Sequence, residues 1–233
     1  MNINNLNKAD NCNECLFKTI SCQYIDKEEF QKLQNSSNLL HYKKGEVIFK
    51  QGAKSSHLVF LSKGVVKFNY EEDNGKNLIL NISKAPILIG GANIFNQSIN
   101  LFSVVAVEDC ICCLIDINIL KRIAFNNTLY IFKLLDVVSG MFHNSIFNFI
   151  SLAHKQVNGR IADVLIYFSK NIYQNKKFDL TFSRQEIAEF AGCSKENVIH
   201  TLRKFHEEGI IKIKGKQIDI INFEKLQQIS KIG

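Results

Sequence analysis

Glycine and other turn residues divide the first half of the chain into short apolar segments. Between residues 39 and 117 no apolar run is long, and glycines recur between the runs. Asp73-Asn74-Gly75 is a strong tight-turn signal between Val65–Tyr70 and Leu78–Ile82. Many short strands joined by glycine-rich turns are typical of a barrel or sandwich. We therefore expect a β-barrel over about residues 25–125.

A helical pattern follows the barrel. From Thr128 to Ala153 the only glycine is Gly140, and apolar residues recur in alternating steps of four and three. Such a stripe is typical of a seam with a partner helix, and a second apolar set beside it predicts cover on two sides. We expect the barrel and a second copy of the chain to cover this helix, although a helix buried inside one domain has a similar pattern. The predicted seam consists of Ile131, Leu135, Val138, Phe142, Ser145, Phe149 and Leu152.

Two helix-start signals and a turn glycine lie between residues 183 and 209. Ser183 and Glu186 have the spacing of a capping box, which predicts a helix that starts at Arg184. Gly192 can adopt the left-handed conformation that ends this helix, and Ser194 then caps a second helix. Two helices joined by a short glycine-containing turn form the helix-turn-helix pattern.

The second of these helices has one apolar and one polar face. Val198, Leu202 and Phe205 are spaced to face the core, while the opposite side carries charged and hydrogen-bonding residues. Two alternating strands, Ile210–Lys214 and Gln217–Ile221, predict a wing with a basic tip. A helix in the major groove of DNA needs this division of faces. The net charge of +7 is compatible with a polyanionic partner, so the pattern favours DNA binding over a purely structural helical subdomain.

These segments resemble the Crp–Fnr family of regulators. Ser183–Lys216 is similar to the family's helix-turn-helix, and Val157–Ala162 to the hinge after its dimer helix. His41–Ile48, Gln51-Gly52 and Ser62–Phe68 resemble its barrel glycine motifs. The resemblance covers about residues 12 to 226.

The resemblance implies an α+β chain. It predicts an N-terminal double-stranded β-helix (jelly-roll, cyclic-nucleotide-binding-like) sensor domain, a long dimerisation helix and a C-terminal winged helix-turn-helix. The implied partners are double-stranded DNA, a second copy of the chain and RNA polymerase. The expected divisions are a cysteine-containing segment at 1–24, the barrel at 25–125, the dimerisation helix at 126–156 and the DNA-binding domain at 157–233.

The resemblance also assigns DNA contacts by position. Residues at the start of the first helix would touch phosphates and groove edges, and residues of the second helix would read bases. His200 departs from the arginine that the family usually has there, and histidine cannot bind guanine bidentately. The predicted DNA-binding residues are Ser183, Arg184, Gln185, Ser194, Lys195, Glu196, Asn197, Ile199, His200, Lys204, Lys214 and Lys216.

The sequence argues against cyclic AMP as the effector. The family's nucleotide binders hold the cyclic phosphate with a cation near the barrel mouth, but residues 87–103 contain no charged residue here. We therefore do not expect cyclic AMP to bind. A barrel that binds a different small metabolite, with purely structural cysteines, is the alternative function.

Cysteines provide a second candidate sensor. Cys12, Cys15 and Cys22 precede the barrel, and the alignment places Cys113 where the family's oxygen sensors have a remote ligand to a [4Fe–4S] cluster. Six residues separate Cys15 from Cys22 here, whereas the corresponding gap in those sensors has five. Strand alternation also allows Cys113 to be a core residue. An iron–sulfur cluster, a structural zinc and unligated thiols stay open, with Cys110 and Cys112 as alternate ligands. The expected function is thus a regulator that responds to a redox or oxygen signal.

Other classes of protein have less support. No apolar run approaches the ~18 residues needed to cross a bilayer, and the polar N-terminus lacks a secretory pattern, so we expect a cytoplasmic protein without membrane contact. A jelly-roll metal enzyme would need clustered histidines and carboxylates on its strands. Only His57 lies within residues 50–115, so we do not expect an enzyme.

Overall fold

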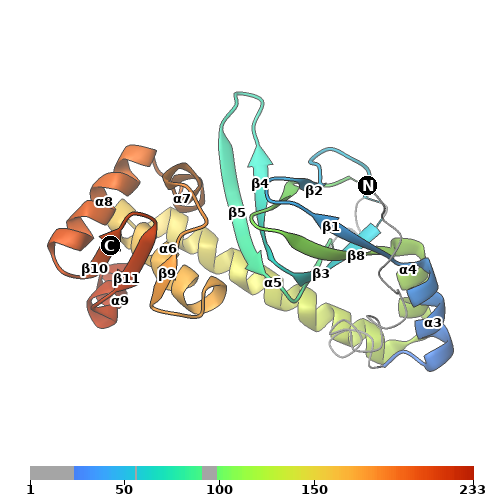
Figure 1. Cartoon of the computed structure of the whole chain (residues 1–233). Coiled ribbons are helices and arrows are strands. Elements are labelled where there is room, and N and C mark those ends of the chain that lie inside the picture. The colour runs from blue at the N-terminus through green and yellow to red at the C-terminus, as the bar shows by residue number, and fades with distance from the viewer. Residues whose placement is uncertain (1–23, 56, 91–98) are drawn as a thin grey trace.

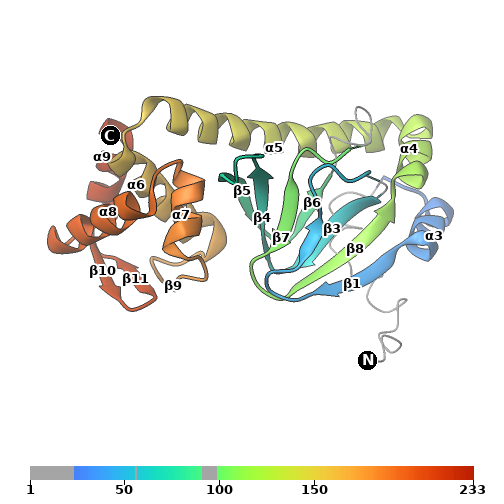
Figure 2. The ribbon, with the colours of Figure 1, turned by 90° about the horizontal axis from the view of Figure 1, so that it is seen from above.

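A single long helix, α5 (Thr128–His154), runs past a β-barrel and ends beside a smaller C-terminal domain (Figure 1). The computed structural model describes residues 24–55, 57–90 and 99–233. In the view from above, the barrel and the C-terminal domain lie on the same side of α5 (Figure 2). No helix among the described residues is long and apolar enough to cross a membrane.

The barrel consists of two antiparallel four-stranded sheets, ordered β1-β8-β3-β6 and β2-β7-β4-β5. Apolar side chains from both sheets fill the space between them, and they include Val59, Leu61, Phe68, Val104 and Cys112. This confirms the jelly-roll fold class. The strands are β1 (Asn38–Tyr42), β2 (Val47–Phe49), β3 (His57–Lys63), β4 (Val65–Glu71), β5 (Asn77–Lys84), β6 (Ile87–Ile89), β7 (Ser103–Ala106) and β8 (Cys110–Asp116).

The predicted turn at Asp73-Asn74-Gly75 connects β4 and β5. Gly75 has φ of 79°, a left-handed value that glycine adopts without strain, and its N–H donates to Glu72 O at 2.9 Å. The two strands pair from Val65↔Lys84 to Glu71↔Asn77, with one irregularity between Phe68 and Asn69. The resulting hairpin rises above the barrel in Figure 1.

Helices cover the outer face of the sheet that contains β8. α3 (Lys27–Ser36), α4 (Ile117–Asn126) and the first turns of α5 bury Leu33, Leu120 and Tyr130 against that face. Leu58, Phe60 and Ile115 supply the strand side of this second apolar cluster. The barrel thus has one core inside and another between its outer face and these helices.

The C-terminal domain is a winged helix-turn-helix, as the sequence predicts. Its apolar core includes Phe168, Ile187, Val198, Phe205 and Ile218. Its third strand, β9, is short, and Leu180 and Phe182 just beyond it are buried in the core. The elements are α6 (Val157–Tyr167), the π-helical turn η2 (Phe168–Ile172), β9 (Lys177–Asp179), α7 (Arg184–Ala191), α8 (Lys195–Glu207), β10 (Ile211–Lys214), β11 (Gln217–Ile220) and α9 (Phe223–Ile232).

We expect Gly192→Ala to destabilise the protein more than Gly215→Ala. Both glycines have left-handed φ values, 59° and 61°, which cost an alanine roughly 1–2 kcal/mol. A Cβ atom at Gly192 would also lie 2.8 Å from Leu152 Cδ2, whereas nothing lies within 4 Å at Gly215. Thermal and urea denaturation of the two variants measure the difference, and equal losses of unfolding free energy would show that the contact with Leu152 relaxes without cost.

Candidate nucleic-acid interface

The first helix of the motif begins at a complete capping box. Ser183 Oγ accepts from the Glu186 N–H at 3.1 Å, and Glu186 Oε2 accepts from the Ser183 N–H at 2.8 Å. These two bonds satisfy backbone donors that a helix start otherwise leaves unpaired. The prediction of this cap is confirmed. It leaves Ser183 and Gln185 exposed and Arg184 half-buried at the start of α7.

The turn between α7 and α8 also follows the sequence signals. Gly192 is left-handed at the C-cap of α7, and Ser194 Oγ accepts from the Asn197 N–H at 3.2 Å at the start of α8. Arg160 Nη1 donates to Gly192 O at 2.9 Å, so a side chain of α6 supports this turn. The turn therefore holds the two helices at a fixed angle.

Helix α8 has one buried and one exposed face. Val198, Leu202 and Phe205 are fully buried in the domain core, as predicted. Thr201 is buried too, and its Oγ1 donates to Asn158 Oδ1 at 2.9 Å on α6. The exposed face holds Lys195, Glu196, Asn197, Ile199, His200, Arg203 and Lys204.

The exposed face of α8 carries an acidic residue near its start and basic residues further along. Bonds from its own backbone N–H and then from the Ser194 hydroxyl lower the pKa of Glu196, so its carboxylate is an acceptor at neutral pH. Arg203 is paired with Glu207 at 2.8 Å. The face can accept hydrogen bonds at its N-terminal end and can supply cations further along.

The wing extends beside this helix. β10 and β11 pair in register from Ile211↔Ile220 to Lys214↔Gln217, and Gly215 makes the turn between them. Lys214 and Lys216 are exposed at that turn. In Figure 1, α8 lies at the end of the molecule that is remote from the barrel, with α7 between α8 and the barrel. The wing turn at Gly215 and Lys216 lines a cavity with Arg184 of α7 and Lys44 of the barrel.

An ion pair joins α7 to the barrel. Lys67 Nζ on β4 lies 2.7 Å from Glu186 Oε1, and the two side chains are only 15% and 25% exposed. Burial raises the pKa of Glu186, but the hydrogen bond from Lys67 and those within the cap outweigh it and lower that pKa. The Tyr167 hydroxyl also donates to the Ile82 carbonyl of β5, and burial raises the pKa of Tyr167 to about 12.

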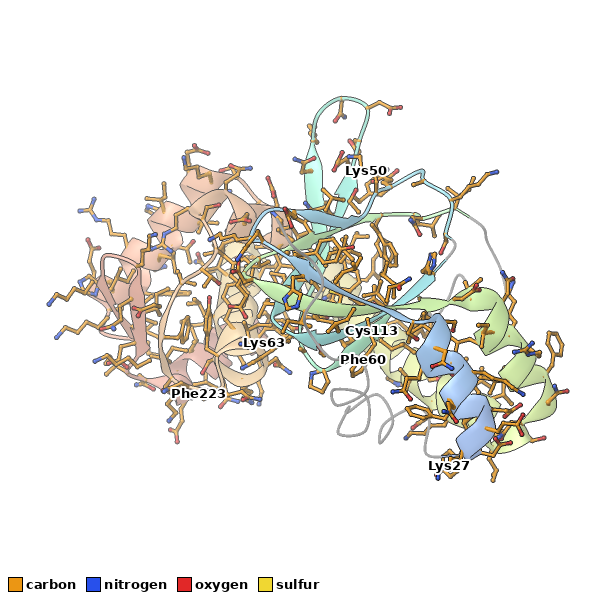
Figure 3. The ribbon with its side chains drawn as sticks, turned by 45° about the vertical axis from the view of Figure 1, so that its right-hand side comes forward. Lys27, Lys50, Phe60, Lys63, Cys113 and Phe223 are labelled. Atoms are coloured by element: carbon orange, nitrogen blue, oxygen red, sulfur yellow. The ribbon has the colours of Figure 1, made fainter. Side chains whose placement is uncertain are left out.

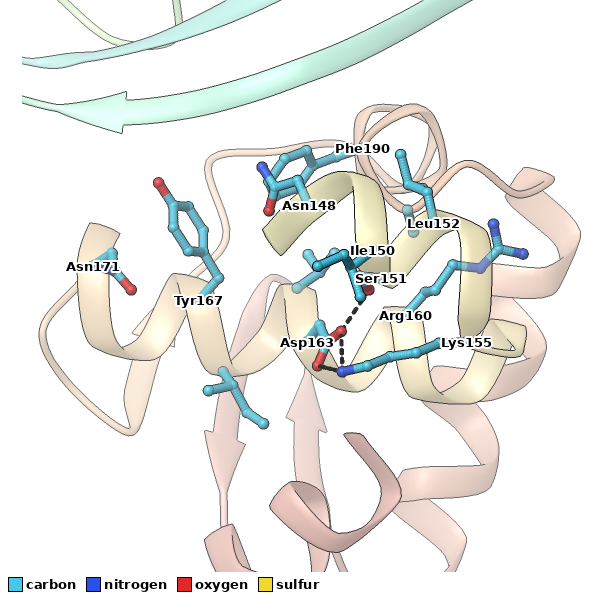
Figure 4. A pocket seen from close by; sticks show the side chains of 13 residues that line it. Asn148, Ile150, Ser151, Leu152, Lys155, Arg160, Asp163, Tyr167, Asn171 and Phe190 are labelled. Atoms are coloured by element: carbon cyan, nitrogen blue, oxygen red, sulfur yellow. Dashed lines mark hydrogen bonds and ion pairs between the residues drawn. The ribbon is translucent and has the colours of Figure 1, made fainter. Parts of the chain in front are cut away.

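A cavity of about 320 Å³ lies where α5 meets the C-terminal domain (Figure 4). Asp163 sits at its edge and accepts from Lys155 Nζ at 2.7 Å, from Ser151 Oγ at 2.6 Å and from Ser230 Oγ. This network ties the last turn of α5 to α6 and α9. No sequence pattern predicted this network, because Lys155 follows α5, Asp163 lies on α6 and no local motif connects them.

The structure places the cysteines of β8 on opposite faces. Cys110 and Cys112 are buried inside the barrel, where burial raises the pKa of Cys112 to about 12. Their expected role as alternate ligands stays a prediction, and both thiols lie on the face of β8 opposite Cys113. Cys113 faces outward, opposite Phe60 of β3, and packs with the cluster that α3 covers (Figure 3).

Two sequence predictions fall partly outside the structure. Cys12, Cys15 and Cys22 lie outside the described residues, as do residues 91–98 of the charge-free stretch at 87–103. Within residues 24–55, 57–90 and 99–233, no three His, Cys, Asp or Glu side chains are grouped as they would be around a metal ion.

Comparison with protein families matches both domains. The sequence model of the cyclic nucleotide-binding domain matches residues 39–127, and that of the Crp-like helix-turn-helix domain matches residues 159–229. The two matches occur in chain order and correspond to the barrel and to the winged domain.

Curated relatives extend over nearly the whole chain. Electron transport regulator A of Shewanella oneidensis is 25% identical over 232 residues, which is 95% of this chain and 91% of the relative. The fumarate and nitrate reduction regulatory protein of Escherichia coli strain K12 is 23% identical over 230 residues, with the same coverage of 95% and 91%.

Solved structures show the same fold. FixK2 from Bradyrhizobium japonicum has a TM-score of 0.76 at 20% identity and covers 83% of this chain and 96% of its own. The c-di-GMP responsive global regulator CLP from Xanthomonas campestris has a TM-score of 0.71 at 21% identity and covers 84% of this chain and 99% of its own.

The barrel and the winged domain define a DNA-binding transcription regulator with a cyclic-nucleotide-binding-like sensor domain. The chain belongs to the Crp–Fnr family. Its relatives regulate transcription and are not enzymes, in agreement with the expectation from the sequence.

Proposed function

We propose that the protein is a homodimer that reads a palindromic operator through α8. The observation that carries this proposal is the division of α8 into a buried apolar face and an exposed face with a capped, acceptor-bearing start. Such a helix fits the major groove, and a two-fold dimer presents two of them to a palindrome. The predicted DNA-binding residues from Ser183 to Lys216 form the proposed contact surface. We further propose RNA polymerase as a partner and the cytoplasm as the location.

The exposed side of α5 supports the proposed dimer. Phe142 is 64% exposed and Phe149 is 69% exposed. In Figure 2, one long side of α5 faces away from both the barrel and the C-terminal domain. Soluble monomers rarely expose an apolar patch of this length. The exposed large apolar residues of α5 are Leu129, Phe132, Leu135, Phe142, Ile146, Phe149 and Ile150.

Three of the seven predicted seam residues, Ile131, Val138 and Leu152, are partly buried within the chain, and the other four are exposed. Ile131 packs against the cluster under α4, and Leu152 is partly buried beside Gly192. Phe132 and Ile146, which neighbour two of the predicted positions, are exposed as well. We therefore propose that the seam centres on Leu135, Phe142, Ser145 and Phe149, with Phe132 and Ile146 beside it.

Glu196→Ala tests base reading. Glu196 is expected to accept from a cytosine amino group in each half-site, so its removal should relax specificity at that base pair by about 1–3 kcal/mol. Selection from random DNA, with wild type and variant side by side, measures the preference at each position. Identical preferences would show that Glu196 does not read bases, and selection without a palindrome would contradict the proposed operator. Lys27→Ala, at the far end of the barrel domain, serves as the control.

Phe142→Glu should yield monomers. Burial of this ring between two helices contributes roughly 1.5–3 kcal/mol per protomer, and a charge in its place opposes pairing. Light scattering measures the mass, and circular dichroism checks that the chain is folded. Ile232→Glu, at a residue 87% exposed on α9, should stay dimeric. A folded and fully dimeric Phe142→Glu protein would place the interface elsewhere.

We propose that the signal is redox or oxygen and that the cysteines sense it. Cys113 lies on the outer barrel face under α3, the helix that directly follows the segment with Cys12, Cys15 and Cys22. Asn127 Nδ2 also donates to Tyr24 O at 2.6 Å, which fixes the start of the described chain near α4 and α5. Four thiolates can hold a [4Fe–4S] cluster, which would supply an oxygen-sensitive group beside the proposed dimer helix.

The names of the relatives support this signal. They refer to electron transport and to fumarate and nitrate reduction, which are redox processes. The alternative is a barrel that binds a small metabolite other than cyclic AMP, supported by the match to the cyclic nucleotide-binding domain.

Anaerobically purified protein should be brown and should contain close to ~4 irons per chain, as a single [4Fe–4S] cluster requires. Cys12→Ser, Cys15→Ser, Cys22→Ser and Cys113→Ser should each remove the colour and the iron. Cys193→Ser, at a thiol that packs against the core of the DNA-binding domain, should retain both. Absorbance spectra and iron assays measure the outcome. Iron-free protein after anaerobic reconstitution would contradict the cluster and favour the metabolite alternative.

A further inference from the structure

The outer face of β4 and β5 is the docking surface for the DNA-binding domain. Val66 and Phe68 of β4 point into the barrel. Val65 and Lys67, which alternate with them along the strand, therefore point outward. Val65 lies in the same buried cluster as residues of the DNA-binding domain, together with Ile79 and Ile82 of β5. Lys67 therefore stands at the edge of an apolar contact between the two domains.

The ion pair of Lys67 differs from the other ion pair that β4 makes. Lys50 and Glu71 are 2.7 Å apart as well, but their side chains are 57% and 43% exposed, against 15% and 25% for Lys67 and Glu186. Water and salt screen an exposed pair strongly and a partly buried pair much less. We therefore expect the ion pair between Lys67 and Glu186 to hold its two elements together more strongly than the pair between Lys50 and Glu71.

Glu186 has two functions in this arrangement. One carboxylate oxygen accepts from the Ser183 N–H of the cap, and the other accepts from Lys67. The side chain that closes the cap of α7 is therefore held by the barrel. Through this side chain, Lys67 restrains the start of α7, where Ser183 and Gln185 are exposed.

A second fixed point lies at the other side of the domain. The Asp163 network holds α6 and α9 to the last turn of α5 through Lys155 and Ser151. One fixed point permits rotation of a rigid domain, whereas two points restrict its angle. The arrangement that results leaves the outer face of α8 uncovered (Figure 1).

We propose that Lys67, a residue of the sensor barrel, is a positioning residue for DNA binding. It fixes the angle at which each protomer presents α8 and thereby the distance between the two recognition helices of a dimer. That distance must match half-sites about one helical turn apart, ~34 Å. This inference rests on the proposed palindromic operator.

The test compares two DNA duplexes: the palindrome selected by wild type, and the same duplex with one base pair inserted between its half-sites. Lys67→Met should bind the first at least about 5-fold more weakly, the low end of typical coupling between sites, and should lose little or no affinity for the second. Lys67→Arg should restore the preference for correct spacing, because it keeps the charge. Lys50→Met, which breaks the exposed pair on the same strand, should behave like wild type.

The double variant Lys67→Met/Glu186→Gln separates this contact from general damage. It should bind no more weakly than the weaker of the single variants, since both remove one interaction. Equal loss of affinity for both duplexes, an additive double variant, or wild-type spacing preference in Lys67→Met would each overturn the proposal. Thermal denaturation and light scattering confirm that each variant is folded and has the mass of wild type.

Amide hydrogen exchange of the DNA-free protein tests the contact independently of the operator. Lys67→Met should speed exchange in residues 183–191, and Lys50→Met should not. Unchanged exchange would overturn the role of Lys67 even if wild type selects a palindrome. Wild type that selects none would contradict the operator, while faster exchange would still show that Lys67 holds α7.

Discussion

Burial of apolar side chains between the outer face of β4–β5 and the DNA-binding domain is the interaction on which the arrangement of the molecule depends. Val65, Ile79 and Ile82 of the barrel belong to the same buried cluster as Phe168 and Phe190. Each domain also has its own core, so the shared cluster decides their relative placement rather than their folding. Polar contacts at its margin, between Lys67 and Glu186 and between Tyr167 and Ile82, give this apolar contact a defined orientation.

Helix α5 also contacts both domains, at a site separate from the β4–β5 surface. One side packs on the barrel through residues such as Leu134, and its last turn holds α6 through the Asp163 network. Its remaining side is apolar and exposed. In the proposed dimer, a change in how the two copies pair along that side would act on both domains, because α5 contacts both of them. The proposed sensor cysteine on β8 lies near the first turns of this helix, and the proposed DNA contacts lie beyond its last turn.

The two faces of β8 have different chemical environments. Inside the barrel, Cys110 and Cys112 are packed among apolar residues, and burial raises the pKa of both thiols. On the outer face, Cys113 lies under α3, close to where the described chain begins. Strand alternation alone places thiols that are adjacent in sequence in these two different environments.

Local signals were sufficient to predict the helix-turn-helix and the wing of the DNA-binding domain. The capping box at Ser183, the left-handed Gly192 and the apolar spacing of α8 depend on residues a few positions apart, so the sequence itself specifies them. The glycine-rich pattern likewise predicted a barrel, although it did not predict which face of β8 meets a helix. The seam of α5 stays a prediction, and the sequence alone did not show which of its apolar residues the barrel and the DNA-binding domain cover. The pairing of Lys67 with Glu186 joins residues 119 positions apart, and only the tertiary structure decided it, since no periodic or local pattern relates side chains that meet through the docking of two domains.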